Sequence, residues 1–400
     1  MKRRNHLLGP SQLGTERRLV SLHYGTPGAG EKAYLQASLH ADELPGMLVM
    51  HHLIALLDRA EAAGRLRGEV VLVPVANPIG LSQQLLHGAI GRFEAGSGEN
   101  FNRGYPDFLA AITPDIATQL DDDAANNRDA IRAALRVHVD AIEPATELAS
   151  LRKTLSSLAC DADIVLDLHC DHDALLHLYC EEPYWPQCEA LARLVGAETV
   201  LLAKNSGGAS FDEAMGGVWW QLDEYLRANR SADRRPIPLA CLAVTVELRG
   251  QMDVSHELAS RDAQALFDFL AYRGIVRGTG REIGRDIVRD IVRDIVTPDV
   301  DHPAYLPALL CEPTPLAASE DLFAPHAGLI VFLKTIGDRI DADEVVAEVI
   351  DPIAGLVTPV RARYAGVLYA RALKRYASPG GAIAKVAGRI AFRSGNLLSP

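Results

Sequence analysis

The order of apolar and polar positions divides the chain into two parts. Between residues 32 and about 270, short apolar runs alternate with amphipathic stretches, a pattern typical of an α/β layer built on a largely parallel sheet. The clearest strands are predicted at 33–39, 70–75, 164–168 and 242–246, and the clearest helices at 47–62 and 260–272. Gly64 and Gly274 follow these two helices and are suited to end them.

The chain beyond Pro298 has a different pattern, with short β runs separated by frequent glycine and proline. Two related halves are visible in it, since residues 324–330 match 362–368 and residues 347–349 match 384–386. Such half-repeats predict a small all-β module, similar to the barrel-sandwich folds of biotin and lipoyl carriers. The turn between the halves, residues 351–355, lacks the lysine that these carriers modify. We therefore expect an accessory domain beside the active site and not a carrier.

A short repeat joins the two parts. Residues 285–296 read Arg-Asp-Ile-Val three times, and a four-residue period keeps the Ile/Val pairs and the Arg/Asp pairs on opposite sides of a helix. Both a tandem duplication tolerated in a linker and a dedicated partner-binding helix fit this pattern, the first of them better. We expect a catalytic domain at 1–275, a linker at 276–305 and a β-rich accessory domain at 306–400.

Composition narrows the class of protein. The chain has 400 residues, of which 48% are apolar, and a formal net charge of -12. That charge, without a long run of lysine or arginine, argues against nucleic acid or an anionic membrane as the main partner. No apolar stretch follows the early basic residues, so we expect neither a secretory signal nor a membrane anchor, and a cytoplasmic location. The six cysteines form no Cys-x-x-Cys pair, which indicates neither a thiolate zinc cluster nor a disulfide framework. The sequence is compatible with both a monomer and a homo-oligomer.

Polar residues stand at the carboxyl ends of the predicted strands. They are His40, Asn77, His169 and Glu247. In an open α/β sheet this edge is where ligands bind, so four motifs from distant parts of the chain are expected to meet on one rim.

Two of these residues, His40 and His169, predict a metal site together with Glu43. His40 and Glu43 lie three positions apart, where a strand stops and Pro45-Gly46 starts a helix. His169 adds a second imidazole from another strand, while the alternative candidate His172 falls in a polar loop beyond it. A His2Glu set leaves one coordination position of zinc open for a water whose pKa the metal lowers to about 7. This is the ligand set of a metal-dependent hydrolase.

Five motifs occur in the order seen in zinc carboxypeptidases. They are His40-Ala41-Asp42-Glu43, Asn77-Pro78-Ile79-Gly80, Asn100-Phe101-Asn102-Arg103, Asp167-Leu168-His169 and Thr245-Val246-Glu247-Leu248-Arg249. With the β-rich tail, the chain most resembles the succinylglutamate desuccinylase and aspartoacylase family, from about residue 20 to the end. The resemblance implies a carboxypeptidase-like three-layer fold and one zinc ion per chain, held by His40, Glu43 and His169. It also implies that Glu247 is the general base that takes a proton from the attacking water and protonates the leaving nitrogen.

The resemblance also implies roles for several arginines. Asn102 and Arg103 would grip a substrate carboxylate, and Arg92 would stabilise the oxyanion. Arg249 shares strand parity with Glu247, so we expect it to face the same pocket and to bind substrate. The family often has a carboxylate where this chain has Asn100, which leaves the orientation of the metal ligands to be tested.

Together these features predict a zinc-dependent deacylase that hydrolyses the amide bond of a small carboxylate-bearing N-acyl amino acid, with esters as a further class of substrate. One alternative is a metallocarboxypeptidase acting on short peptides. Another is a non-catalytic small-molecule-binding protein. The glycine-rich loop at 206–213 fits either a substrate loop or an ordinary turn, and Trp219 and Trp220 are placed to wall a pocket.

Overall fold

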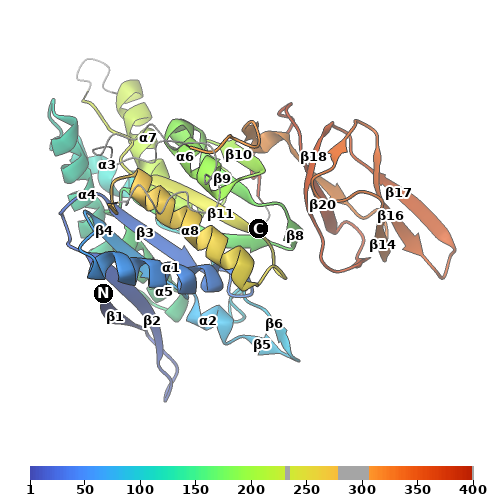
Figure 1. Ribbon diagram of the computed structural model, residues 1–400, viewed down its shortest axis with the longest axis horizontal. Helices are drawn as coiled ribbons and strands as arrows, with labels where there is room; N and C mark the ends of the chain where they lie inside the picture. The colour runs from blue at the N-terminus through green and yellow to red at the C-terminus, as the bar shows by residue number, and fades with distance from the viewer. Residues whose placement is uncertain (230–234, 278–305, 399–400) are drawn as a thin grey trace, which may run out of the picture.

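A computed structural model describes residues 1–229, 235–277 and 306–398, and its larger part is built on one nine-stranded sheet (Figure 1). The strand order is β1-β2-β4-β3-β7-β11-β9-β10-β12. The β4-β3-β7-β11 stretch and the β9-β10-β12 stretch are parallel, while β1, β2 and the β11-β9 junction pair antiparallel. The strands are β1 Lys2–Leu8, β2 Arg17–Gly25, β3 Lys32–Ala37, β4 Glu69–Val73, β7 Ile164–Asp171, β9 His177–Glu181, β10 Thr199–Ala203, β11 Leu242–Gly250 and β12 Thr314–Pro315.

Helices cover both faces of this sheet, which gives three layers. One buried core includes residues of α1, α6 and α8, and a second core on the opposite face includes residues of α3, α4, α5 and α7. The helices are α1 Pro45–Ala62, α2 Pro78–Leu81, α3 Phe108–Ile116, α4 Ala124–Ala141, α5 Glu147–Ala159, α6 Trp185–Val195, α7 Phe211–Asn229 and α8 His256–Tyr272. No helix in the described ranges is long and apolar enough to cross a membrane.

The strands and helices predicted from periodicity are confirmed. The four predicted strands correspond to β3, β4, β7 and β11, and the two predicted helices to α1 and α8. Gly64 and Gly274 lie just beyond α1 and α8 with φ of 65° and 75°, a left-handed conformation that glycine adopts without steric cost. Continuous apolar runs such as 164–168 form strands that are buried on both faces, as expected when helices cover the two sides.

The C-terminal part forms two small antiparallel sheets around a separate core. One sheet has the order β13-β20-β18-β15 and the other β17-β16-β14-β19. The strands are β13 Ser319–Phe323, β14 Gly328–Phe332, β15 Arg339–Ile340, β16 Val345–Asp351, β17 Leu356–Arg361, β18 Gly366–Arg371, β19 Tyr376–Ala377 and β20 Ala382–Ala387. The predicted α/β class with a mostly parallel sheet and a small all-β unit is therefore confirmed.

The half-repeats read from the sequence occupy equivalent places in these sheets. Ile330 of β14 pairs with Val349 of β16, and Leu368 of β18 pairs with Val386 of β20. The two glycines that begin β14 and β18 approach the opposite backbone in the same way, since a Cβ on either would lie 2.4 Å from a carbonyl oxygen. The Arg-Asp-Ile-Val repeat lies outside the described residues.

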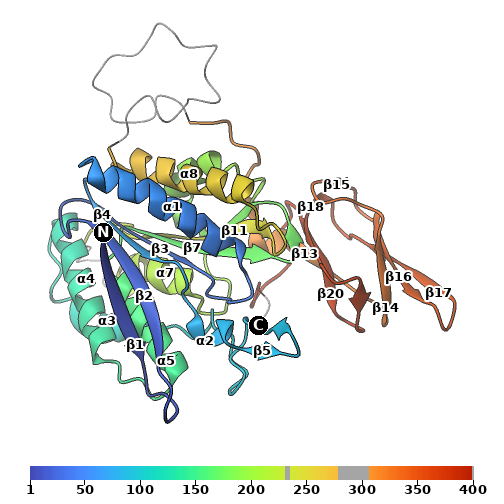
Figure 2. The same cartoon turned by 60° about the horizontal axis from the view of Figure 1, so that its bottom comes forward.

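The C-terminal unit is attached to the larger unit at the carboxyl edge of the large sheet (Figure 2). A two-residue strand after β7, β8 (Asp173–Ala174), pairs antiparallel with β18. Arg371 of β18 donates a 2.8 Å hydrogen bond to Asp173, and Lys385 of β20 donates one of 2.6 Å to Asp171. The unit therefore borders the edge where the predicted site residues lie.

Candidate metal centre

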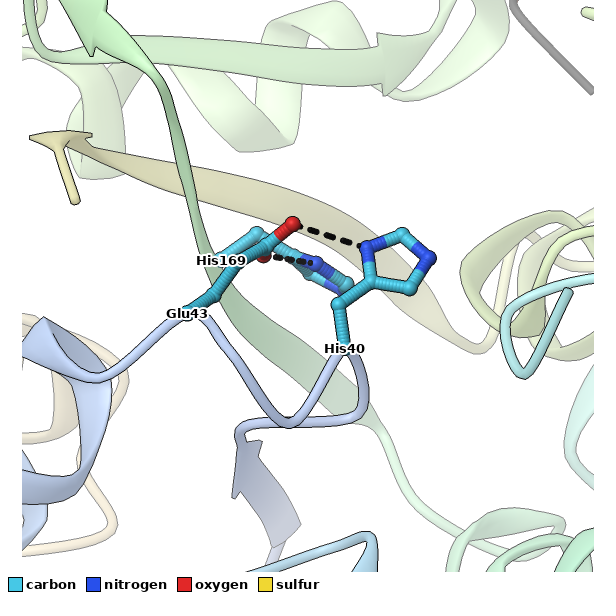
Figure 3. A group of neighbouring side chains, drawn as sticks. All are labelled: His40, Glu43 and His169. Carbon is cyan, nitrogen blue, oxygen red and sulfur yellow. Dashed lines mark hydrogen bonds and ion pairs between the residues drawn. The ribbon is translucent and has the colours of Figure 1, made fainter. Parts of the chain in front are cut away.

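His40, Glu43 and His169 converge at the carboxyl ends of two neighbouring strands (Figure 3). β3 and β7 are parallel partners with Ala37 opposite Leu168, so the turn after β3 comes to lie beside the end of β7. The turn carries His40, and Glu43 follows it just before α1 begins at Pro45. The backbone closes tightly here because Ser38 Oγ donates a 2.8 Å hydrogen bond to the carbonyl of Glu43.

The three side chains present their donor atoms to one another. His40 Nδ1 lies 2.9 Å from Glu43 Oε1, and His169 Nδ1 lies 2.7 Å from Glu43 Oε2. One ligand atom from each residue lies within 4.8 Å of the others, and all three residues are 5% exposed or less. Two imidazole nitrogens and a carboxylate gathered at this range could hold a divalent cation.

The far nitrogens of both rings have partners that fix the rings. His40 Nε2 lies 2.9 Å from Asn100 Oδ1, which also accepts a 2.8 Å hydrogen bond from the backbone N–H of Asn102. The backbone hydrogen bond identifies the atom that faces His40 as the amide oxygen, an acceptor like a carboxylate oxygen. His40 then carries its proton on Nε2, which leaves Nδ1 free to bind a metal. Asn100 Nδ2 is buried without a partner. Asn100 therefore differs from the carboxylate common in the family only at its Nδ2 atom.

His169 is held on its far side by Asp167. Its Nε2 lies 2.9 Å from Asp167 Oδ2, close enough for an ion pair although poorly aligned for a hydrogen bond. Burial lowers the pKa of His169, but the charges of Asp167 and Glu43 outweigh it and raise that pKa well above its ordinary value. Burial likewise opposes ionisation of Glu43, yet the two histidines hold its pKa well below the usual range. The site therefore attracts positive charge, as a cation site must.

Glu247 stands beside this cluster on the adjacent strand. β11 pairs with β7 so that Glu247 lies opposite His169. Its Oε2 is buried without a hydrogen-bond partner in the described structure. Burial, followed by the nearby charge of Glu43, raises the pKa of Glu247 to about 8. A carboxyl group with a raised pKa beside a metal-binding cluster is suited to exchange protons near neutral pH.

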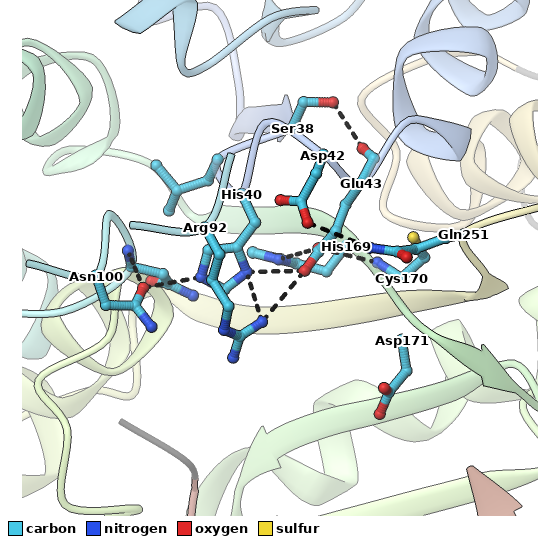
Figure 4. A network of polar contacts seen from close by, with 12 residues as sticks. Ser38, His40, Asp42, Glu43, Arg92, Asn100, His169, Cys170, Asp171 and Gln251 are labelled. Carbon is cyan, nitrogen blue, oxygen red and sulfur yellow. Dashed lines mark hydrogen bonds and ion pairs between the residues drawn. The ribbon is translucent and has the colours of Figure 1, made fainter. Parts of the chain in front are cut away.

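Arg92 reaches the cluster from a loop that crosses the turn after β3 (Figure 4). Gly91 makes the crossing feasible, because a Cβ there would lie 2.2 Å from the backbone nitrogen of Asp42. The carbonyl of Gly91 accepts a 3.0 Å hydrogen bond from Ala41. Arg92 Nη1 then lies 3.3 Å from His40 Nδ1 and 3.4 Å from Glu43 Oε1. Arg92 therefore lies beside the cluster, and its predicted contact with the oxyanion stays a prediction.

Asn102 and Arg103 line the same cavity. Asn102 Oδ1 accepts a 2.9 Å hydrogen bond from the backbone N–H of Phe211, which ties it to the start of α7. Arg103 packs over the glycine-rich loop, since a Cβ on Gly208 would lie 2.6 Å from Arg103 Nε. Burial, and then the charge of Arg92, lowers the pKa of Arg103 from its ordinary value. The loop at 206–213 therefore supports a residue of the cavity.

Arg249 is not brought to the cavity. Its guanidinium forms an ion pair with both carboxylate oxygens of the buried Asp262 on α8. The strand register shifts between Glu247 and Gly250, and Arg249 has φ of 65°. This irregularity breaks the alternation on which the prediction depended, because a bulge redirects the side chains that follow it.

The cavity has a volume of about 560 Å³, and the C-terminal unit supplies part of its wall. Asp171, Tyr369 and Lys385 line the cavity and were not predicted from the sequence. Asp167 was noted only as part of the motif that ends at His169. Asn77 is structural, since its side chain caps α2 and donates a 2.8 Å hydrogen bond to the carbonyl of Leu39. His172 is largely exposed and outside the His-Glu-His cluster.

Comparison with known proteins identifies the family to which the chain is similar. A family model described as the succinylglutamate desuccinylase/aspartoacylase catalytic domain matches residues 29–273. A solved structure of a protein assigned to that family from Shewanella amazonensis has 26% identity and a TM-score of 0.77, covering 97% of this chain and 98% of the other. A second, from Shewanella frigidimarina, has 24% identity and a TM-score of 0.75, with 97% of each chain covered. No curated protein matches the chain.

Proposed function

The chain belongs to the succinylglutamate desuccinylase/aspartoacylase family, and on this premise we propose that it is a zinc-dependent deacylase acting on the amide bond of a small, carboxylate-bearing N-acyl amino acid. The observation that carries the proposal is the placement of Glu247. Its buried, unpartnered Oε2 lies beside a His-Glu-His cluster that could hold a cation. Esters are a second substrate class, because the same chemistry serves both bonds.

His40, Glu43 and His169 would hold the metal. When bound, a zinc ion supplies Lewis acidity and lowers the pKa of a water molecule in its open position. Glu247 accepts the proton of the attacking water and passes it to the leaving nitrogen, two transfers that suit a carboxyl group whose pKa is raised to about 8. Asp167 and Asn100 keep the two imidazoles oriented.

Arg92 and Arg103 are placed to contact different charged parts of the substrate. Arg92 lies 3.3–3.4 Å from two ligand residues, so its guanidinium is placed to share negative charge that develops on the carbonyl oxygen. Arg103, supported by Gly208 and next to Asn102, is placed to bind a carboxylate through paired N–H groups. Substrate orientation then follows from these two fixed anchors.

The wall of the cavity favours a deacylase over a carboxypeptidase. The cavity that contains the His-Glu-His cluster is also lined by residues of the C-terminal unit, namely Tyr369, Lys385 and Leu397. A peptide longer than a few residues would meet this unit, while an acylated amino acid fits within about 560 Å³. Activity on longer peptides would favour the carboxypeptidase instead.

The test is a panel of N-acetyl and N-succinyl amino acids, assayed with zinc-loaded enzyme and with two variants. Glu247→Gln should abolish turnover while one zinc per chain is retained, because the amide keeps the shape and loses the proton acceptor. Glu224→Gln is the control, since Glu224 is an exposed partner of Lys204, and it should leave turnover unchanged. Retained activity in Glu247→Gln would remove it as the base. Metal binding without hydrolysis of any substrate would favour a binding protein.

A further inference from the structure

The cavity continues past Arg103 into an acidic end that the proposed reaction does not use. Glu181 at the end of β9 lines it together with Asp212 and Glu213 in the first turn of α7. The three carboxylates come from two elements that both pack against β11. Their arrangement can be traced along that strand, starting from Glu247.

One face of β11 leads from the proposed base to the acidic end. Thr245, two residues before Glu247, donates a 3.0 Å hydrogen bond from Oγ1 to Asp212 Oδ2. β9 runs antiparallel to β11 with Val244 opposite Cys180, so Glu181 comes next to Ala243, two residues further on the same face. Each such step is about 7 Å. A side chain extending from a substrate α-carbon near Glu247 would point toward Asp212, and Glu181 lies one further step along the strand.

Two buried polar atoms at this end have no partner in the described structure. They are Glu181 Oε2 and Ser206 Oγ, on residues that are each 4% exposed and line the cavity. Glu181 Oε1 accepts a 2.6 Å hydrogen bond from Trp220 Nε1. Room for the carboxylate exists because a Cβ on Gly216 would lie 2.3 Å from Glu181 Oε2. Both unpartnered atoms can accept a hydrogen bond from a cationic group.

The charges at this end are unbalanced. Burial and the neighbouring Asp212 raise the pKa of Glu213 to about 7, and burial, with Asp212 and Glu213, raises the pKa of Glu181 well above its ordinary value. Asp212 and Glu213 also act on Arg103. Because burial and mutual repulsion disfavour the ionised forms of these carboxyl groups, a ligand that places a positive charge among them would be favoured.

We propose that Glu181, Asp212, Glu213 and Ser206 form a subsite for an ammonium or guanidinium group, so that the substrate is the N-acyl derivative of a basic amino acid. Its α-carboxylate binds Asn102 and Arg103, its acyl carbonyl faces the metal cluster, and its cationic side chain enters the acidic end. This inference rests on the proposed function and narrows its substrate class. An acidic side chain in the same place would be repelled.

Matched substrates test the subsite with the unaltered, zinc-loaded enzyme. Nα-acetyl-lysine and Nα-acetyl-norleucine differ by the ammonium group alone, as do Nα-acetyl-ornithine and Nα-acetyl-norvaline. The cationic member of each pair should have kcat/KM higher by about tenfold or more, as expected of charge-assisted hydrogen bonds. Equal values, or a preference for the neutral member or for Nα-acetyl-glutamate, would overturn the proposal.

Variants show whether these carboxylates cause the preference. Asp212→Asn and Glu181→Gln should reduce the lysine-to-norleucine ratio of kcat/KM toward one, because they lower the value for the lysine derivative more than the value for the norleucine derivative. The control Glu224→Gln should keep the full ratio. An unchanged ratio in both acidic variants, each folded and metal-loaded, would overturn the assignment.

Calorimetry separates this inference from the proposed reaction and does not depend on folding of the variants. Free lysine and norleucine are titrated into the zinc-loaded parent enzyme. Tighter binding of lysine supports the subsite even if no acyl amino acid is hydrolysed, in which case the proposed function fails alone. Hydrolysis of neutral acyl amino acids, with equal binding of lysine and norleucine, retains the function and removes the subsite.

Discussion

Lys385 of β20 lies 2.6 Å from Asp171 of β7, so the C-terminal unit is bonded to a strand end two residues from His169. Burial opposes ionisation of Asp171, but the charge of Lys385 outweighs it and lowers the pKa of that carboxyl. The side chain of Asp171 is 13% exposed and that of Lys385 is 32% exposed. The pair joins the two units at the wall of the cavity, 214 residues apart in sequence.

Replacing Lys385 by Met should destabilise the protein, because Asp171 would keep a mostly buried charge without its partner. Loss of one member of a fully buried pair costs about 3–5 kcal/mol, and the partial exposure of Lys385 reduces the expected loss to about 2 kcal/mol. Urea unfolding of the metal-loaded protein measures it. Lys374→Met, at an exposed position of the same unit, is the control, and equal stability of the two variants would contradict the prediction.

Removing the metal should lower the stability of the folded protein. A ligand that binds only the native state adds about 4 kcal/mol when present at about a thousand times its dissociation constant, and the cluster of His40, Glu43 and His169 could provide such binding. A chelator should lower the melting temperature of the parent protein. His169→Ala should bind no stoichiometric metal and show no response to chelator.

His172 gives the matched control for that experiment. It is 63% exposed at the side chain and lies three residues beyond His169. His172→Ala should retain one metal ion per chain and the full response to chelator. Loss of metal in His172→Ala with retention in His169→Ala would reverse the ligand assignment.

The parts of the site that the sequence predicted are those that depend on strand ends. His40, His169 and Glu247 follow apolar runs whose strands pair in parallel, so the sheet brings them together without further detail. Asp171 and Lys385 were missed because their contact depends on how a separate unit docks. The sequence around Asp171 and the sequence around Lys385 contain no pattern that predicts contact between the two units.

Arg249 lies at the point on β11 where the alternation of side chains no longer predicts which face a residue occupies. Alternation predicts the facing of a side chain only while the strand is regular, and the register shift after Glu247 with the positive φ at Arg249 ends that regularity. The alternative partner, Asp262, lies on α8, and no short-range signal links it to β11. The C-terminal half-repeats were readable because both copies obey the same pairing.

Replacing Arg249 by Met should therefore affect stability and not substrate binding. Asp262 is 2% exposed and would be left with only the exposed Arg261, 3.8 Å away, as a cationic neighbour, at a cost of about 2 kcal/mol, less than that of a buried charge with no partner. KM for the preferred acyl amino acid should stay within about twofold of the parent value. The double variant Arg249→Met/Asp262→Asn should recover part of the stability. A large rise in KM without loss of stability would return Arg249 to the substrate site.

Gly208→Ala should weaken substrate binding by displacing Arg103. The added Cβ would lie 2.6 Å from Arg103 Nε and 2.7 Å from Cδ, so the guanidinium must move from its place beside Asn102. We expect KM to rise about tenfold, with a smaller change in kcat and no change in metal content. Gly88→Ala, in the exposed β5–β6 hairpin (Gln84–Leu85 and Gly88–Ala89), is the control. An unchanged KM in Gly208→Ala would argue against Arg103 as the carboxylate anchor.

Asp268 on α8 should make the stability of the protein fall as the pH rises. Burial raises its pKa to about 6 from 3.8, although a hydrogen bond of 2.8 Å from Gln264 Nε2 acts in the opposite direction. Between these two values the folded state retains a proton that the unfolded state has released. The unfolded state then binds fewer protons, so the free energy of unfolding decreases with pH in this window and levels off above pH 6.

Asp268→Asn removes this effect, so its stability relative to the parent protein should increase between pH 4 and pH 7. A shift of two pKa units corresponds to about 3 kcal/mol, and the partial exposure of Asp268 reduces the expected gain to about 1–2 kcal/mol. Urea unfolding at pH 5 and pH 8 should detect about half of that gain or more. Asp129→Asn, at an exposed position on α4, should give the same difference from the parent at both pH values. If the difference for Asp268→Asn is also independent of pH, the Asp268 carboxyl is ionised in the folded protein at pH 5 and its pKa is not raised.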